Sequence, residues 1–237
     1  MFIRSLRGAG VAVFLASLMW AQAGPDGHWE GAFTVDNRQI GLSLDLAKND
    51  KSEWTASMGV PSQNATGLVV KDLAVSGKSV KFMAVELQMS ICDLTLGPDG
   101  KLAGTITGQR GGPLPIEFKR TGEAKVALPA TSPAVSKELE GDWEGTLPAP
   151  NGGFQMAVHF KNQADKTVAA TIDILNRGTM GMPINDVRQT GQKVEFGLKI
   201  AQSSFQGSLN KEGTELALQM IHEPDSTPLM QLTLRKK

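Results

Sequence analysis

Histidine is the side chain best suited to acid–base chemistry near neutral pH, and it is also a common metal ligand. The chain has three histidines, His28, His159 and His222. Two have an acidic neighbour, in His28-x-Glu30 and His222-Glu223. A zinc site needs three or four converging donors, and each of these pairs supplies only two. We therefore expect no metal site.

Nucleophilic catalysis has few candidates in this sequence. It does not contain the Gly-x-Ser-x-Gly elbow. The single cysteine, Cys92, has no evident histidine partner and lies in a strand-like segment, so we expect a buried core residue. Without a recognisable catalytic constellation we do not expect an enzyme. A small hydrolase or isomerase that uses Asp173, or a histidine at a barrel rim, is the alternative.

The glycine-rich stretches are candidates for binding a phosphate group. Gly111-Gly112-Pro113 and Asn151-Gly152-Gly153 lie between strand-like segments. A phosphate cradle needs a helix that begins directly after the glycines, and no helix is predicted there. We expect loops at these positions and no cofactor.

Ligand binding has better candidates. Trp29 and Trp143 could stack on a ligand, although each offers a large area that a core would also bury. The second half is rich in methionine, which suits an adaptable apolar surface or fills gaps in a core. Asp173 adds a carboxylate. The candidate ligand-binding residues are Trp29, Trp143, Asp173, Met180 and Met182.

The two tryptophans belong to an internal repeat. His28-Trp29-Glu30-Gly31 returns as Asp142-Trp143-Glu144-Gly145, a shift of 114 positions that also aligns much of the rest of the two halves. At this shift His28 falls on Asp142, and Asp45 falls on His159. No histidine is duplicated, so we expect none to mark a site shared by the two repeats.

Each repeat has the period-two pattern of β-strands. In 39–46, apolar residues alternate with polar or small ones, which places Ile40, Leu42, Leu44 and Leu46 on one face. We expect about eight short strands per repeat, separated by turns, and no convincing helix. This predicts two tandem antiparallel meander β-barrels of the calycin or lipocalin type, with twisted β-sandwiches as the alternative. The further strands expected are 54–60, 67–75, 79–85, 90–96, 101–107 and 114–119, then 168–174, 182–187, 193–200, 204–209, 215–221 and 230–234.

The chain divides into four parts. Residues 1–23 read as a signal peptide, with Arg4 and Arg7, a short apolar core and a cleavage site after Ala23. Residues 24–120 form repeat one, 121–139 a linker, and 140–237 repeat two. We therefore expect a periplasmic or secreted protein with no membrane span after cleavage.

The charge balance argues against nucleic acid as a partner. Without Arg4 and Arg7, 22 basic residues face 24 acidic ones, and no basic block occurs. Phosphate neutralisation by basic side chains supplies much of the affinity for nucleic acids. A small apolar ligand or another extracytoplasmic protein is the partner we expect.

Short motifs give each repeat a resemblance to a known module. Each resembles the β-rich accessory module found N-terminal to the catalytic domain of exported bacterial serine hydrolases and α/β-hydrolases. That module opens with Trp-x-Gly, carries a middle Asp-Ser-Pro-x-Gln-Gly and a later Gly-Ile-Pro, and ends in Arg. The matching residues are Trp29-Glu30-Gly31, Pro61, Gln63 and Arg120, then Trp143-Glu144-Gly145, Asp173, Gly178, Gly181-Met182-Pro183 and Arg235.

The resemblance implies an accessory role without catalysis, because no hydrolase domain follows the repeats. In small calycin-like barrels a Gly-x-Trp on the first strand packs across the closed end, and Gly27-His28-Trp29 and Gly141-Asp142-Trp143 are similar. The function we expect is therefore an exported, non-catalytic binding or interaction protein. An accessory subunit of a separate hydrolase is a further alternative. The sequence leaves open the ligand, the packing between repeats and the oligomeric state.

Overall fold

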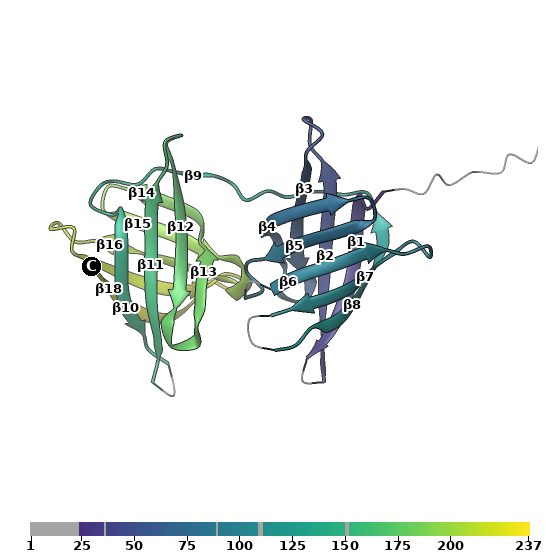
Figure 1. Ribbon diagram of the computed structural model, residues 1–237. Helices are drawn as coiled ribbons and strands as arrows, with labels where there is room; N and C mark the ends of the chain where they lie inside the picture. Colours follow the sequence, from purple (N-terminus) through teal and green to yellow (C-terminus); the bar gives the residue numbers. More distant parts are fainter. Residues whose placement is uncertain (1–23, 36, 89, 109–110, 150–151) are drawn as a thin grey trace, which may run out of the picture.

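The computed structural model describes residues 24–35, 37–88, 90–108, 111–149 and 152–237, so the expected signal peptide lies outside the described residues. The first repeat folds into a closed antiparallel barrel of eight strands, each paired with the next along the chain (Figure 1). β8 returns to pair with β1 and closes the barrel. The strands are β1 (Gly27–Val35), β2 (Arg38–Lys48), β3 (Trp54–Val60), β4 (Ala65–Ser76), β5 (Ser79–Ala84), β6 (Ser90–Leu96), β7 (Lys101–Thr107) and β8 (Leu114–Gly122).

The second repeat forms a barrel-like sheet that is nearly closed. Its strand order runs from β13 to β14, which are consecutive in the chain and separated by Ile184 alone. The Ile184 amide donates to the Ala170 carbonyl of β12 at 3.0 Å, so the residue between β13 and β14 is also hydrogen-bonded to the sheet. The strands are β10 (Gly141–Leu147), β11 (Phe154–Asn162), β12 (Thr167–Ile174), β13 (Thr179–Pro183), β14 (Asn185–Thr190), β15 (Lys193–Leu198), β16 (Ser203–Leu209), β17 (Glu215–His222) and β18 (Thr227–Lys236).

The expected fold class, two antiparallel barrels, is confirmed. Equivalent turns also share their conformation. The 3-10 helices η1 (Pro61–Gln63) and η2 (Leu175–Arg177) both end in a left-handed residue. A third, η3 (Lys199–Ala201), ends the same way.

The segment 121–139 does more than connect the barrels. Within it, the short strand β9 (Ser132–Pro133) pairs with β12. Ser132 Oγ accepts a hydrogen bond from the Val187 amide at 2.9 Å. Leu139 is fully buried in the second core. The latter part of this segment therefore packs as part of the second barrel.

Side chains fill both barrels. Leu42, Leu44 and Leu46 alternate inward on β2, as expected, and are essentially unexposed. Cys92 is also fully buried, and burial raises the pKa of its thiol to about 12. The thiol is therefore an inert core group, as predicted. Among the described residues, no helix has the length and apolar character needed to cross a membrane.

Candidate functional site

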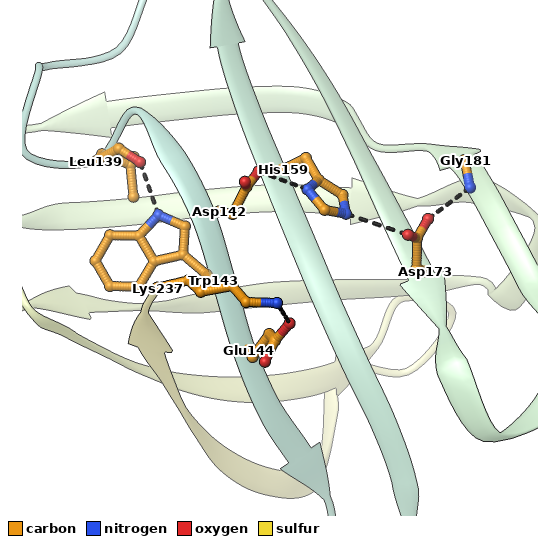
Figure 2. Close-up of polar contacts among 8 residues, drawn as sticks. All are labelled: Leu139, Asp142, Trp143, Glu144, His159, Asp173, Gly181 and Lys237. Carbon is orange, nitrogen blue, oxygen red and sulfur yellow. Dashed lines mark hydrogen bonds and ion pairs between the residues drawn. The ribbon is translucent and has the colours of Figure 1, made fainter.

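Each tryptophan closes one end of its barrel and leaves no face for a ligand. Trp29 and Trp143 are fully buried. The Trp29 indole N–H donates to the Pro25 carbonyl at 2.9 Å. The Trp143 indole N–H donates to the Leu139 carbonyl at 2.8 Å, as Figure 2 shows. Because a buried indole N–H needs an acceptor, these two carbonyls fix the rings in place. The structure thus places both residues in the cores.

A positively charged side chain lies over the ring of each tryptophan. The Arg120 guanidinium lies 4.8 Å from the Trp29 ring centroid, and Lys236 Nζ lies 5.5 Å from that of Trp143. The resemblance matched Arg235, rather than Lys236, to Arg120. In the structure Lys236 takes the place that Arg120 has in the first barrel, because Arg235 bonds to Glu215 at the surface and strand pairing places Trp143 opposite Lys236.

The opposite end of the second barrel opens into an apolar cavity, which we call mouth 2. Trp143 lies early in β10, whereas Leu147, at the end of that strand, lines the cavity. The volume of mouth 2 is about 410 Å³. Its lining is Gln88, Leu147, Phe154, Met156, Ile172, Ile174, Arg177, Thr179, Met182, Leu198, Phe205 and Met220.

The two methionines predicted to bind a ligand, Met180 and Met182, differ in their position relative to mouth 2. Met182 lines the cavity, while Met180, two positions earlier on β13, is 49% exposed and is not part of the lining. Asp173 is also not part of the lining, although Ile172 and Ile174 on either side of it are. Of the five predicted site residues, Met182 alone lines mouth 2, and Asp173 lies beside it through its bond to the Gly181 amide.

The first barrel has a corresponding cavity, mouth 1, with a volume of about 440 Å³. Phe33 and Val35 line it from the end of β1 opposite Trp29. Ile200 from η3 of the second barrel also lines it. The other lining residues are Ile40, Val60, Gln63, Glu86, Leu87, Gln88, Ser90, Ile106, Gly108, Gly111, Gly112 and Leu114.

The two mouths meet where the barrels touch. Gln88 lines both cavities, so it lies between them. Ile200 packs against the core of the first barrel, and Gln202 Nε2 donates to the Gln63 carbonyl. Gln88 and Gln202 are equivalent at the 114-residue shift, and both have a positive φ. Each barrel thus contributes the same turn to the contact.

Glu86 is the one acidic residue among the described residues that line mouth 1, and sequence analysis missed it. Its residue exposure is 4%. Oε2 accepts a hydrogen bond from the Val69 amide at 2.8 Å, while Oε1 is buried and has no hydrogen-bond partner among the described residues. Burial raises the pKa of this carboxyl, although the Val69 amide and the charges of Lys199 and Lys71 oppose the shift.

A second polar cluster lies on the outer face of the second barrel. His159 Nδ1 is 2.7 Å from Asp142 Oδ1, and its Nε2 is 3.2 Å from Asp173 Oδ2 (Figure 2). Neutral imidazole has one N–H, so only the protonated ring can donate to both carboxylates. Partial burial lowers the pKa of His159, but the hydrogen bonds and charges of Asp142 and Asp173 outweigh it and raise that pKa above 6.5.

Asp173 of this cluster also bonds to the backbone of β13, where the pairing of β12 and β13 is irregular. Asp173 Oδ1 accepts the Gly181 amide at 2.6 Å, where the β12–β13 register shifts between Ile172 and Ile174 (Figure 2). The two carboxylates bind opposite nitrogens of one ring, so they do not converge. Across the described part of the chain, no group of three or more His, Cys, Asp or Glu side chains could hold a metal ion.

Comparisons with known proteins do not assign the chain to a family. The sequence matches no protein-family model and no curated protein. It is similar to a protein of unknown function from the DUF3598 family of Nostoc punctiforme, at 14% identity over 89% of this chain and 94% of that one, with a TM-score of 0.26. It is also similar to a putative outer membrane protein of Bacteroides fragilis, at 13% identity over 90% and 96%, with a TM-score of 0.25. Similarities at these TM-scores carry no argument about function.

Proposed function

We propose that this protein is an exported, non-catalytic binding protein that takes a small apolar ligand into the mouths of its barrels. The observation that carries this proposal is mouth 2, an apolar cavity of about 410 Å³ at the end of a filled barrel. Small-molecule sites are typically concave, largely apolar and roughly 300–1,000 Å³ in volume. Mouth 2 has these properties.

The lining of mouth 2 suits an adaptable apolar contact. Met156, Met182 and Met220 contribute flexible thioether side chains, which adjust to irregular apolar shapes. Arg177 adds a polar group, and its guanidinium lies 5.2 Å from the Phe154 ring centroid. A ligand that buries an apolar body against the methionines gains the hydrophobic term that drives such binding.

Export is part of the proposal and rests on the first residues of the sequence. Arg4 and Arg7, the apolar stretch 8–20 and Ala21-Gln22-Ala23 form the pattern of a cleaved signal peptide. We place the protein in the periplasm or outside the cell.

The test uses N-phenyl-1-naphthylamine, a neutral apolar probe whose fluorescence rises on leaving water. The change is Met182→Trp, which fills mouth 2 from within. The matched control is Met180→Trp, the same substitution on the same strand at an exposed position outside the cavity. Thermal unfolding of each variant checks that the fold is retained.

We expect the wild type and Met180→Trp to bind the probe with saturable, equal affinity, and Met182→Trp to bind at least about tenfold more weakly through this mouth. Equal binding by all three proteins would place the probe elsewhere and overturn mouth 2 as the ligand site. No saturable binding to the wild type would overturn the proposed function itself.

A further inference from the structure

Mouth 2 has a positive charge at its rim. Arg177 is the one charged side chain among the described residues that line this cavity. It is exposed and is the last residue of η2. The rest of the lining is apolar except for Thr179 and Gln88. The guanidinium therefore borders both the solvent and an apolar cavity.

Local hydrogen bonds hold η2 beside the strand that carries Phe154. Asn176, directly before Arg177, donates from Nδ2 to the Gly153 carbonyl at 2.9 Å, and its Oδ1 accepts the Gln155 amide at 3.2 Å. The Arg177 guanidinium lies 5.2 Å from the ring centroid of Phe154, which also lines mouth 2. These contacts place the guanidinium at the opening, within reach of a head group that a bound ligand leaves at the rim.

The charge of Arg177 is not neutralised by a neighbouring acid in the part of the chain that the structure describes. The ion pairs found there do not include Arg177. Asp173 is the acid nearest to it in the sequence, but Asp173 Oδ1 accepts the Gly181 amide and Oδ2 lies 3.2 Å from His159 Nε2. An anionic head group at the rim would gain an attractive interaction with Arg177, whereas a cationic one would be repelled.

The equivalent turn of the first barrel carries a neutral residue. At the 114-residue shift Arg177 corresponds to Gln63, the last residue of η1. Gln63 lines mouth 1, as Arg177 lines mouth 2, and both turns end in a left-handed residue. Glutamine is therefore compatible with this turn, so Arg177→Gln removes the charge with little risk to the fold.

We propose that the ligand of mouth 2 is an amphiphile with one hydrocarbon chain and a carboxylate head, in which the carboxylate pairs with Arg177 while the chain packs against Met156, Met182 and Met220. This inference rests on the proposed function and names the ligand class of the same cavity. A guanidinium matches the planar geometry of a carboxylate and can donate two parallel hydrogen bonds to it. The volume of about 410 Å³ accommodates a chain of medium length.

The experiment measures displacement of N-phenyl-1-naphthylamine from the purified exported protein at neutral pH. The competitors share a ten-carbon chain and differ in the charge of the head: decanoate, 1-decanol and decylammonium, each below its micelle concentration. The test variant is Arg177→Gln, which copies Gln63. The matched control is Arg188→Gln, which removes the same charge from an exposed position on β14 outside mouth 2. Met182→Trp identifies the displacement that occurs at mouth 2.

We expect the wild type and Arg188→Gln to bind decanoate about fivefold or more tightly than decylammonium. Arg177→Gln should bind decanoate about fivefold more weakly than the wild type does, with its affinity for 1-decanol nearly unchanged. Added salt should weaken the binding of decanoate to the wild type but not that of 1-decanol, because it screens the rim charge.

Equal affinity of the wild type and Arg177→Gln for decanoate would overturn the assignment of a carboxylate ligand and leave the apolar binding function standing. The same conclusion would follow if N-phenyl-1-naphthylamine bound saturably but decanoate did not displace it. If N-phenyl-1-naphthylamine itself did not bind, the proposed function would fail, and this inference with it.

Discussion

His28 on β1 and Asp45 on β2 form the same cross-strand pair that the second barrel forms with its members exchanged. Nδ1 of His28 lies 2.8 Å from Asp45 Oδ1, and Nδ1 of His159 lies 2.7 Å from Asp142 Oδ1. No histidine is duplicated between the repeats, but each barrel contains one histidine–aspartate pair at this position. In the repeat alignment, the two positions of this pair carry different residue types in the two barrels. In both sheets, however, a histidine on one strand bonds to an aspartate on the next, with the two residues exchanged between strands.

The His159 cluster should be most stabilising below neutral pH. The folded-state pKa of His159 is raised above its ordinary value of 6.5, so its contribution is complete below that pH and is lost as the pH rises through the folded pKa. We expect an NMR titration to show this raised pKa. Asp173→Asn should lower it toward 6.5, while the amide oxygen still accepts the Gly181 N–H.

The matched control for that titration is Asp50→Asn, which removes an exposed carboxylate from a turn of the first barrel. It should leave the His159 titration unchanged. If His159 titrated at its ordinary value in the wild type, or did not respond to Asp173→Asn, the cluster would not be the ion pair network described.

Replacing either closing tryptophan should destabilise its barrel. Trp143→Phe removes the hydrogen bond to Leu139 and leaves unfilled volume in a fully buried site. We expect a loss of about 2–4 kcal/mol in the free energy of unfolding, measured with urea. Trp54→Phe, at a partly exposed position, is the control and should cost less than about 1 kcal/mol. Equal losses in the two variants would contradict a closing role for Trp143.

The repeated spacing Trp-x-Gly has a steric cause. A Cβ at Gly31 would lie 2.4 Å from the Glu117 carbonyl oxygen, and one at Gly145 would lie 2.5 Å from that of Thr233. Either substitution to alanine should therefore cost about 1–3 kcal/mol. A Cβ at Gly41 would meet nothing within 4 Å, so Gly41→Ala should be neutral or slightly stabilising in the same unfolding assay. A neutral Gly31→Ala would show that β1 and β8 can separate without cost.

The thiol of Cys92 should be unreactive in the folded protein. It is fully buried, and its pKa of about 12 leaves almost no thiolate at pH 8. A thiol-specific disulfide reagent such as DTNB should modify no cysteine in the native protein and one per chain in urea. Rapid modification of the native protein would mean that β6 opens readily or that the thiol reaches solvent.

Much of the fold could be predicted from local sequence. The alternation in 39–46 predicts β2 and its buried face, and the repeated Trp-x-Gly predicts where each barrel begins. These signals act over a few residues. Strand ends were less predictable: 193–200 was expected as one strand, but β15 ends at Leu198 and η3 follows, because the chain turns there toward the other barrel.

The site was less predictable, because it depends on pairs that are distant in the sequence. Glu86 meets Val69 only once β4 and the turn after β5 are adjacent. Its signal was the mismatch with Ile200 in the repeat alignment, combined with that of Val69 and Pro183. Met180 and Met182 could not be told apart by residue type, since which of them faces the cavity depends on the register of β13.

Native mass spectrometry of the protein, exported to a periplasm and purified without refolding, tests the central claim most directly. We expect a reproducible added mass that disappears on denaturation and is recovered in an organic extract as an apolar compound. The Met182→Trp variant should lose it or carry less of it, whereas Met180→Trp should retain it. An apo mass for every protein, together with no saturable binding of N-phenyl-1-naphthylamine, would contradict the account of the barrel mouths as ligand sites.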